Sequence, residues 1–215
     1  LKGMLPELYG KADGVAAGKG GSMHLISLDH NFLGTSAIVG TTIPVAVGFA
    51  LASQRARNNQ ITVSFFGDGA TEEGVFLESV NFAALHRLPV LFVCENNGYA
   101  IHQPLEKRWA TNRLCERVET YGIPAQLIST GDVFDIRNAA ASALEPMRNS
   151  DAGPAFLECR TYRWREHVGP EEDFDAGYRN REEAEKWLTA DPVKVVGDLI
   201  PSELRIEIDT AIEHE

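Results

Sequence analysis

The sequence predicts an α/β fold with a mostly parallel sheet and helices on both of its faces. Two short apolar runs, Ile61–Phe66 and Val90–Cys94, have the composition of buried strands, and Thr71–Arg87 between them shows helical spacing of its apolar residues. A helix between two apolar strands is typical of a βαβ unit in a parallel sheet that is covered on both faces. The alternation continues with strand Ala125–Ser129, helix Asp132–Arg148 and strand Ala155–Thr161.

The segments on either side of this alternation differ from it in composition. Residues 1–36 are dense in glycine, which favours irregular backbone with close approaches. Thr41–Arg57 is apolar on nearly every face and carries Pro44 in its first turn, so we expect a buried helix there. A long polar loop follows residue 161, and such a loop is either disordered or functional. Three amphipathic helices are then expected, at Arg181–Leu188, Pro192–Ile200 and Ser202–His214.

Charge and hydrophobicity exclude several classes of function. The 215 residues include 20 basic and 31 acidic side chains, a net charge of −11, whereas nucleic-acid binders and proteins that dock on anionic membranes need a basic surface. The sequence contains no run of about 18 uncharged apolar residues that could span a membrane. Cys94, Cys115 and Cys159 are widely spaced, which favours reduced thiols and a cytoplasmic location over a disulfide framework or a zinc site.

Polar turns follow two of the predicted strands. Gly67-Asp68-Gly69 comes directly after the first strand and Glu95–Tyr99 after the second, and one βαβ unit brings both turns to the same edge of a sheet. The Asp68 carboxylate, the Asn97 amide oxygen and a nearby main-chain carbonyl are the hard oxygen ligands that magnesium prefers. The flanking glycines let the backbone approach a diphosphate, and a helix that starts at Thr71 would direct its N-terminal amides at the same anion.

These turns resemble a known cofactor motif. GDG, 26 further residues and then NN is similar to the thiamine-diphosphate-binding motif. The surrounding sequence resembles the α subunit of the decarboxylating component of 2-oxo acid dehydrogenases of the pyruvate, branched-chain and acetoin types. This resemblance extends from Gly10 to about Pro192, and it also rests on GKGGSMH at Gly18–His24, AIVG at Ala37–Gly40 and TYRWREH at Thr161–His167.

The resemblance implies roles for individual residues. Asp68 and Asn97 would coordinate magnesium through their side chains, and Tyr99 through its main-chain oxygen. Ile101 would wedge the cofactor into its bent shape, His24 would act as a proton donor on the substrate side, and His167 would contact the diphosphate and the reacting groups. Histidine suits such work because it titrates near neutral pH. The remaining cofactor contacts are expected from backbone at Gly67, Gly69, Ala70, Ala37 and Val39.

The resemblance also implies a domain division and partners. Residues 1–190 would form the thiamine-diphosphate-binding domain, without its N-terminal part, and residues 191–215 a C-terminal helical extension. Because the chain starts at Leu1 in a segment typical of a helix end, we expect further residues upstream. A β subunit would supply the glutamate that activates the cofactor, in an α2β2 assembly. The acyl group from a small 2-oxo acid would pass to the lipoyl group of an acyltransferase or to another acceptor.

Two other functions are compatible with the same residues. The first is a carboligase similar to transketolase or acetolactate synthase, which would use the same diphosphate site with another fate for the carbanion. The second is a non-catalytic scaffold that keeps the fold. The presence of His24, Asp68, Asn97 and His167 at matching positions argues against the scaffold.

Overall fold

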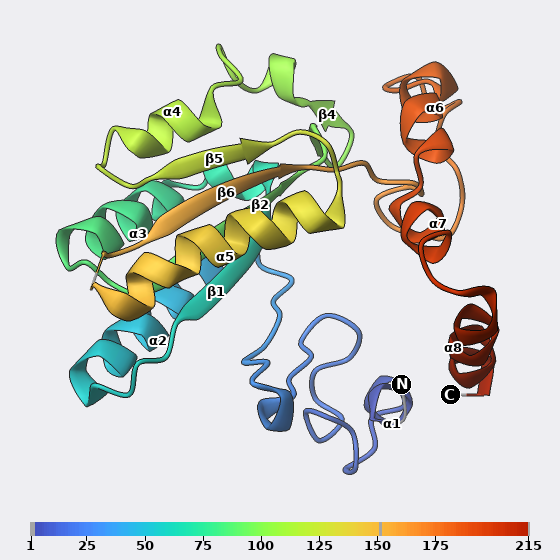
Figure 1. Cartoon of the computed structure of the whole chain (residues 1–215). Coiled ribbons are helices and arrows are strands. Elements are labelled where there is room, and N and C mark those ends of the chain that lie inside the picture. Colours follow the sequence, from blue (N-terminus) through green and yellow to red (C-terminus); the bar gives the residue numbers. More distant parts are fainter. Residues whose placement is uncertain (1–2, 151, 215) are drawn as a thin grey trace. The chain divides into compact units, whose positions relative to one another are not determined.

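The computed structural model describes residues 3–150 and 152–214, and its contacts divide the chain into two units (Figure 1). The sheet unit comprises Gly40–Pro192, and the terminal unit comprises Leu1–Val39 together with Val193–Glu215. Each unit has its own internal contacts and is described in turn. The predicted domain boundary at residue 190 stays a prediction.

A parallel sheet forms the centre of the sheet unit, which confirms the predicted fold class. Its four strands lie in the order β1-β2-β6-β5, and all three pairings between them are parallel. The strands are β1 (Thr62–Gly67), β2 (Val90–Asn96), β6 (Ala155–Arg160) and β5 (Ala125–Ile128). A two-stranded antiparallel hairpin, β3 (Tyr99–Ala100) with β4 (Gln103–Pro104), follows β2.

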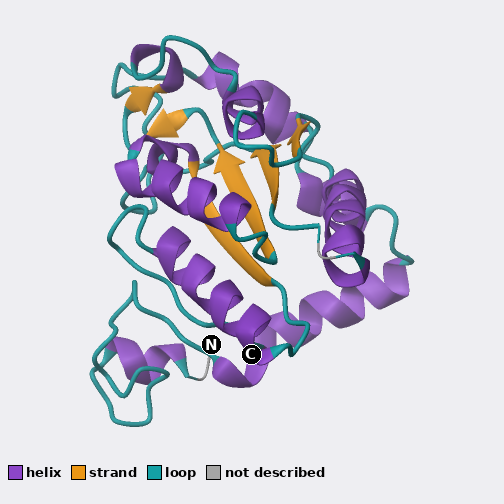
Figure 2. Cartoon of the chain, turned by 90° about the vertical axis from the view of Figure 1, so that its left-hand side faces the viewer, coloured by secondary structure: helices purple, strands orange, loops and turns teal. Residues whose placement is uncertain are grey.

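Helices cover both faces of this sheet (Figures 1 and 2). The core on one face contains residues of α2 (Thr42–Ala56), α3 (Gly74–Leu85) and α4 (Leu114–Glu119), and the core on the other face contains residues of α5 (Val133–Asn149). Successive residues of β2 enter opposite cores, because side chains alternate along a strand: Val90, Phe92 and Cys94 belong to the first core, and Leu91 and Val93 to the second. This double burial explains the unbroken apolar run in the sequence.

Two helices differ from their predictions. The helix predicted to start at Thr71 is α3, and it starts only at Gly74. Asp68–Glu72 forms the 3-10 helix η2 instead, in which the Thr71 hydroxyl donates a 2.7 Å hydrogen bond to the Asp68 carbonyl. Helix α2 is buried along one face, whereas Val45 and Phe49 on its other face are exposed.

The remaining elements are short or terminal. Asp132 caps α5, because its side chain accepts hydrogen bonds from two backbone amides of the first turn. The three helices expected near the C-terminus are α6 (Arg181–Thr189), α7 (Pro192–Gly197) and α8 (Ser202–His214). The structure also contains α1 (Met4–Leu8) and the 3-10 helices η1 (Leu28–His30) and η3 (Leu105–Lys107). No helix within the described residues is long and apolar enough to cross a membrane. All three cysteines are free thiols.

Candidate functional site

The ends of β1 and β2 lie side by side, as the sequence predicts. Gly67 at the end of β1 is in register with Glu95 of β2. Asp68 and the Asn96–Asn97 turn therefore follow at the same edge of the sheet. In open α/β sheets, ligands bind at this carboxyl-terminal edge.

The Asp68 side chain is buried at this edge, with 1% of the residue exposed. Its Oδ2 atom forms an ion pair with Arg108. Its Oδ1 atom is also buried and has no hydrogen-bond partner. A buried carboxylate oxygen without a partner is costly, and a hard cation is the kind of ligand that would satisfy it.

Asn96 and Asn97 have different environments. Asn96 is buried, and its side-chain amide donates a 2.7 Å hydrogen bond to Glu158 of β6. Its Oδ1 atom accepts a 3.0 Å bond from the Gly98 amide, so Asn96 ties the turn to the sheet. Asn97 is only half-buried, and its Oδ1 atom accepts a 2.9 Å bond from the Tyr99 amide. The Asn97 oxygen keeps a second lone pair for a ligand.

The donor set at this edge fits magnesium. Asp68 offers a carboxylate oxygen without a partner, and Asn97 and the main chain of Tyr99 offer neutral oxygens. Across residues 3–150 and 152–214, no group of three His, Cys, Asp or Glu side chains could hold a metal ion. A metal bound at Asp68 would therefore depend on neutral oxygens, on water and on an anionic ligand such as a diphosphate.

Arg108 is a site residue that sequence reasoning missed. Its side chain is 7% exposed and forms ion pairs with both Asp68 and Glu72. The guanidinium also donates a 3.0 Å hydrogen bond to the carbonyl of Gln103, and this bond holds the Arg108 side chain against β4. The positively charged Arg108 thus contacts the Asp68 carboxylate, which the sequence predicts to be a metal ligand.

Gly69 and Ala70 lie in η2, close to the β3–β4 hairpin. A Cβ atom on Gly69 would lie 3.0 Å from the Cβ atom of Ala100, so the close approach favours glycine at this position. A cavity of about 450 Å³ opens beside Asp68. The cavity lining includes one of the predicted site residues, Asp68. It also includes Asn96 and residues between Trp109 and Arg117.

Ile101 has an unusual backbone conformation. Its φ angle is +56°, a left-handed value that a β-branched residue rarely adopts, and such outliers cluster at functional sites. The Ile101 side chain is exposed. Its carbonyl accepts a 2.9 Å hydrogen bond from Arg163, which links the turn after β3 to the loop that carries His167.

That loop is ordered by buried charges. The Arg179 side chain is fully buried and donates to Asp173 at 2.7 Å and to the carbonyls of Arg163 and Arg165 at 2.6 and 2.9 Å. The Arg163 guanidinium and the Tyr178 hydroxyl also contact the Asp173 carboxylate. Burial alone would raise the pKa of Asp173, but these partners lower it overall. The structure gives this segment a hydrogen-bonded conformation, and its functional role stays a prediction.

Tyr99 connects the turn after β2 to α6. Its hydroxyl donates to the carboxylate of Glu183, at 2.7 Å to Oε2, and its ring packs edge-on against Tyr178 at 5.6 Å. Burial and the bond to Glu183 raise the pKa of Tyr99. The phenol therefore stays protonated and leaves the main-chain oxygen of Tyr99 as its only donor suited to a cation.

His167 is exposed on the ordered loop. Desolvation lowers its pKa below 6.5, and the nearby positive charges of Arg163 and of His102 lower it further. A neutral imidazole can accept a proton or donate its N–H at neutral pH.

We expect an NMR titration of His167 to give a pKa below 6.5, and His102→Asn to move that pKa back toward 6.5. The pKa is lower in the folded state than in the unfolded state, so the contribution of His167 to stability is complete above pH 6.5. It is lost as the pH falls through the folded-state pKa. An unchanged His167 pKa in His102→Asn would contradict this electrostatic coupling.

The other three predicted residues, His24, Ala37 and Val39, belong to the terminal unit. All three are exposed there. The His24 amide donates a 3.2 Å hydrogen bond to the Gly20 carbonyl, within the glycine-rich segment. Their roles stay predictions.

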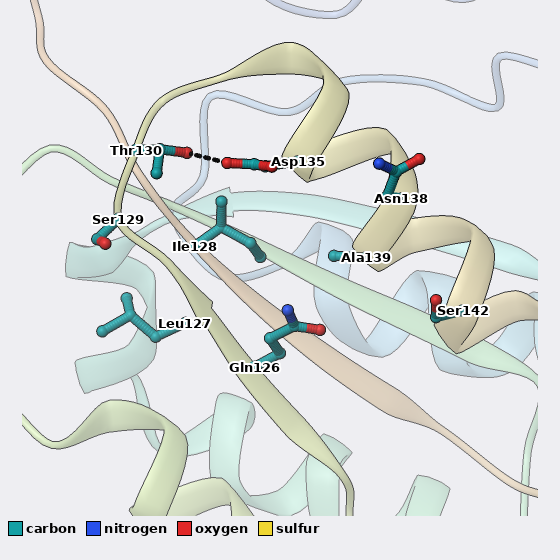
Figure 3. Close-up of a pocket in the computed structure, with 9 residues that line it drawn as sticks. All are labelled: Gln126, Leu127, Ile128, Ser129, Thr130, Asp135, Asn138, Ala139 and Ser142. Atoms are coloured by element: carbon teal, nitrogen blue, oxygen red, sulfur yellow. Dashed lines mark hydrogen bonds between the residues drawn. The ribbon is translucent and has the colours of Figure 1, made fainter.

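A second cavity, of about 340 Å³, lies between β5 and the start of α5 (Figure 3). Its lining contains both polar and apolar side chains, and the Thr130 hydroxyl donates a 2.8 Å hydrogen bond to Asp135. The lining includes none of the predicted site residues.

Comparisons with known proteins identify the family. The model of the dehydrogenase E1 component family matches residues 1–204. The chain is 42% identical over 163 residues to the α subunit of acetoin:2,6-dichlorophenolindophenol oxidoreductase of Bacillus subtilis, covering 76% of this chain and 49% of that protein. It is 41% identical over 180 residues to the pyruvate dehydrogenase E1 component α subunit of Zymomonas mobilis, covering 84% and 50%. The chain thus spans about half the length of these relatives.

Solved structures give the same fold. The transketolase of Campylobacter jejuni has a TM-score of 0.50 and 24% sequence identity, over 60% of this chain and 20% of that chain. A transketolase of Pichia stipitis also has a TM-score of 0.50, at 23% identity over 59% and 20%. At this level of identity, the likeness concerns the fold alone. The family match over nearly the whole sequence and the two relatives above 40% identity establish that the chain belongs to the dehydrogenase E1 component family.

Proposed function

We propose that this chain is the α subunit of a 2-oxo acid dehydrogenase that depends on thiamine diphosphate and magnesium. The observation that carries this proposal is the buried carboxylate of Asp68, whose Oδ1 atom has no partner, beside the Asn97 turn at the ends of β1 and β2. The family supports thiamine diphosphate as the cofactor, and the oxygen donors at this edge support magnesium. Decarboxylation of a 2-oxo acid is the reaction that pyruvate dehydrogenase relatives suggest.

Thiamine diphosphate, when bound, supplies a nucleophilic carbon and an electron sink. The residues of this chain hold and orient it. Asp68, Asn97 and the main chain of Tyr99 would hold the metal, and the amides of Gly69 and Ala70 would bind the diphosphate. Ile101, in its left-handed conformation, would press an apolar side chain against the cofactor. The neutral imidazole of His167 would hold or pass a proton near the diphosphate, and His24 would do so on the substrate side.

The relatives are named as α subunits, which supports a β subunit as partner. We place the activating glutamate in that β subunit and the active site at the α/β interface of an α2β2 assembly. The acyl group would pass to the lipoyl group of an acyltransferase or to another acceptor. The acetoin-type relative of Bacillus subtilis has an artificial electron acceptor in its name, so such an acceptor is a practical assay reagent.

Reconstitution with the β subunit tests the proposal. We expect calorimetry to show binding of thiamine diphosphate only when magnesium is present. The reconstituted pair should then reduce 2,6-dichlorophenolindophenol with a 2-oxo acid or with acetoin as substrate. Absence of cofactor binding at millimolar magnesium would contradict the proposal. Binding without any oxidative activity, but with carbon–carbon bond formation, would favour a carboligase.

Arg108 gives a prediction about the metal alone. Because Arg108 forms an ion pair with Asp68, an incoming cation meets a positive charge on its own ligand. We expect Arg108→Met to tighten binding of Mn²⁺, measured by electron paramagnetic resonance, by about tenfold, the scale on which a neighbouring charge changes ion affinity at a carboxylate. Arg113→Met is the matched control, because that arginine also lines the cavity but is 64% exposed and pairs with Glu116. Weaker Mn²⁺ binding by Arg108→Met would show that Arg108 supports the metal site.

A further inference from the structure

The carboxylate of Glu7 is buried in a ring of backbone amides. Glu7 lies in α1 and is 1% exposed. Its Oε2 atom accepts hydrogen bonds from the amides of Ala16 at 2.8 Å and Gly18 at 2.9 Å. Its Oε1 atom accepts from Gly20 at 2.5 Å and Gly21 at 3.2 Å. Four amides of the glycine-rich segment therefore converge on one side chain.

These amides hold a negative charge without a basic side chain. No ion pair involves Glu7 in the part of the chain that the structure describes. Burial alone would raise the pKa of Glu7, but the four amide donors lower it below its ordinary value. A concave group of backbone N–H donors is a typical anion-binding nest. Here the nest is filled by a carboxylate of the same chain, so it serves the conformation of the loop.

The glycines of the segment fit this arrangement. Gly18 and Gly21 have φ angles of +74° and +59°, which other residues rarely adopt. A Cβ atom on Gly14 would collide with Glu7, and a Cβ atom on Gly20 would collide with the His24 carbonyl. The segment can therefore close around Glu7 only with glycine at positions 14 and 20.

One peptide group connects this nest to His24. The Gly21 amide donates a 3.2 Å hydrogen bond to Glu7, and the carbonyl of the same peptide group, that of Gly20, accepts a 3.2 Å hydrogen bond from the His24 amide. Movement of the Gly20–Gly21 peptide group would therefore displace the backbone of His24. The side chain of His24 itself is exposed, so its backbone is what fixes its position.

We propose that Glu7 is a positioning residue for His24. Its carboxylate holds the loop of residues 16–21 in one conformation, and this conformation sets the point from which the His24 side chain leaves the backbone. Both Glu7 oxygens are occupied by amides, so Glu7 acts through the loop and not on substrate. The inference rests on the proposed function for the task of His24. Displacement of a catalytic group by about 1 Å can cost on the order of 100-fold in rate.

Hydrogen–deuterium exchange of the reconstituted α/β complex tests the structural half of this inference without turnover. We expect Glu7→Gln to speed exchange of the amides at residues 16–21 by about tenfold or more, because charge-assisted hydrogen bonds are lost. Asp13→Asn is the matched control, because Asp13 is an exposed acid in the same segment, and exchange should stay unchanged in it. Unchanged exchange in Glu7→Gln would overturn the proposal, even if the proposed function failed and no activity were found.

A double-mutant cycle tests the link to His24. We expect Glu7→Gln to lower kcat by about tenfold while the KM for thiamine diphosphate stays within about twofold, and to add little in a His24→Ala background. An equal loss of kcat in both backgrounds would overturn the positioning role. Gly20→Ala opens the same loop without removing a charge and should reproduce the exchange and kcat effects if Glu7→Gln does not fold. Cofactor binding that fails in the wild-type complex would instead contradict the proposed function.

Discussion

Asp68→Asn should abolish magnesium-dependent binding of thiamine diphosphate. The substitution keeps the size of the side chain but removes the charge of a buried carboxylate whose Oδ1 atom has no partner. Changes to residues that merely support metal ligands cost about 10–100-fold in metal affinity, so loss of the ligand charge itself should cost more. We expect calorimetry to detect no cofactor binding at magnesium concentrations that saturate the wild-type protein. Activity of the reconstituted complex should be lost with it.

Glu72→Gln is the matched control for this experiment. Glu72 is the second acid paired with Arg108 and lies in the same 3-10 helix, but its side chain is 32% exposed. Removing its charge should leave cofactor affinity within a few-fold of wild type, because Glu72 is partly exposed and Arg108 keeps its ion pair with Asp68. Asp68→Asn also leaves Arg108 without its buried partner, so thermal unfolding of both variants must accompany the binding data. Equal loss of binding in the two variants would contradict the assignment of Asp68 as metal ligand.

The sheet could be predicted because both of its faces are buried. Residues 90–94 alternate between two cores, so every position had to be apolar, and the run was visible in the sequence. The start of α3 could not be placed in the same way. Residues 68–72 form a 3-10 helix in which the Thr71 hydroxyl bonds to the Asp68 carbonyl, and threonine makes such bonds in several backbone conformations.

Amino-acid composition also failed to predict which apolar side chains are exposed. Helix α2 is apolar on nearly all of its faces, and no pattern in it indicates that Val45 and Phe49 stay exposed. The six-residue helix α4 and the two-residue strands β3 and β4 are too short to show a period. Their formation depends on tertiary contacts, such as the burial of Leu114 and Val118 in the first core.

Site residues could be predicted only where they directly follow a predicted strand. Asp68 and Asn97 directly follow strands, so topology alone predicts that they meet. Arg108 lies 40 residues from Asp68 in the chain, and nothing local indicates their contact. Glu158 is different, because a charged residue within the apolar strand β6 is a signal that the sequence does contain. Its burial beside Asn96 shows that this charge has a structural task.

Arg179→Met should disorder the loop that carries His167. The Arg179 guanidinium is fully buried and bonds to Asp173 and to two backbone carbonyls of the loop. Methionine fills much of the volume but leaves the Asp173 carboxylate without its main partner, and breaking a buried ion pair in this way costs about 3–5 kcal/mol. We expect hydrogen–deuterium exchange to become fast throughout residues 161–180. The KM for thiamine diphosphate should rise, because His167 lies on the same loop and because Arg163, which contacts Asp173, also donates to the Ile101 carbonyl.

Arg181→Met provides a control of the same chemistry two residues away. Arg181 also lies over the Phe174 ring, at 5.0 Å against 4.9 Å for Arg179, but its side chain is 58% exposed and pairs with Glu172 on the surface. Its removal should change stability by about 1 kcal/mol or less and leave loop exchange slow. Arg179→Lys should rescue only in part, because an ammonium group cannot reach the carboxylate and both carbonyls in one plane. If Arg179→Met and Arg181→Met behaved alike, the order of the loop would have to come from its packing and not from the buried charges around Asp173.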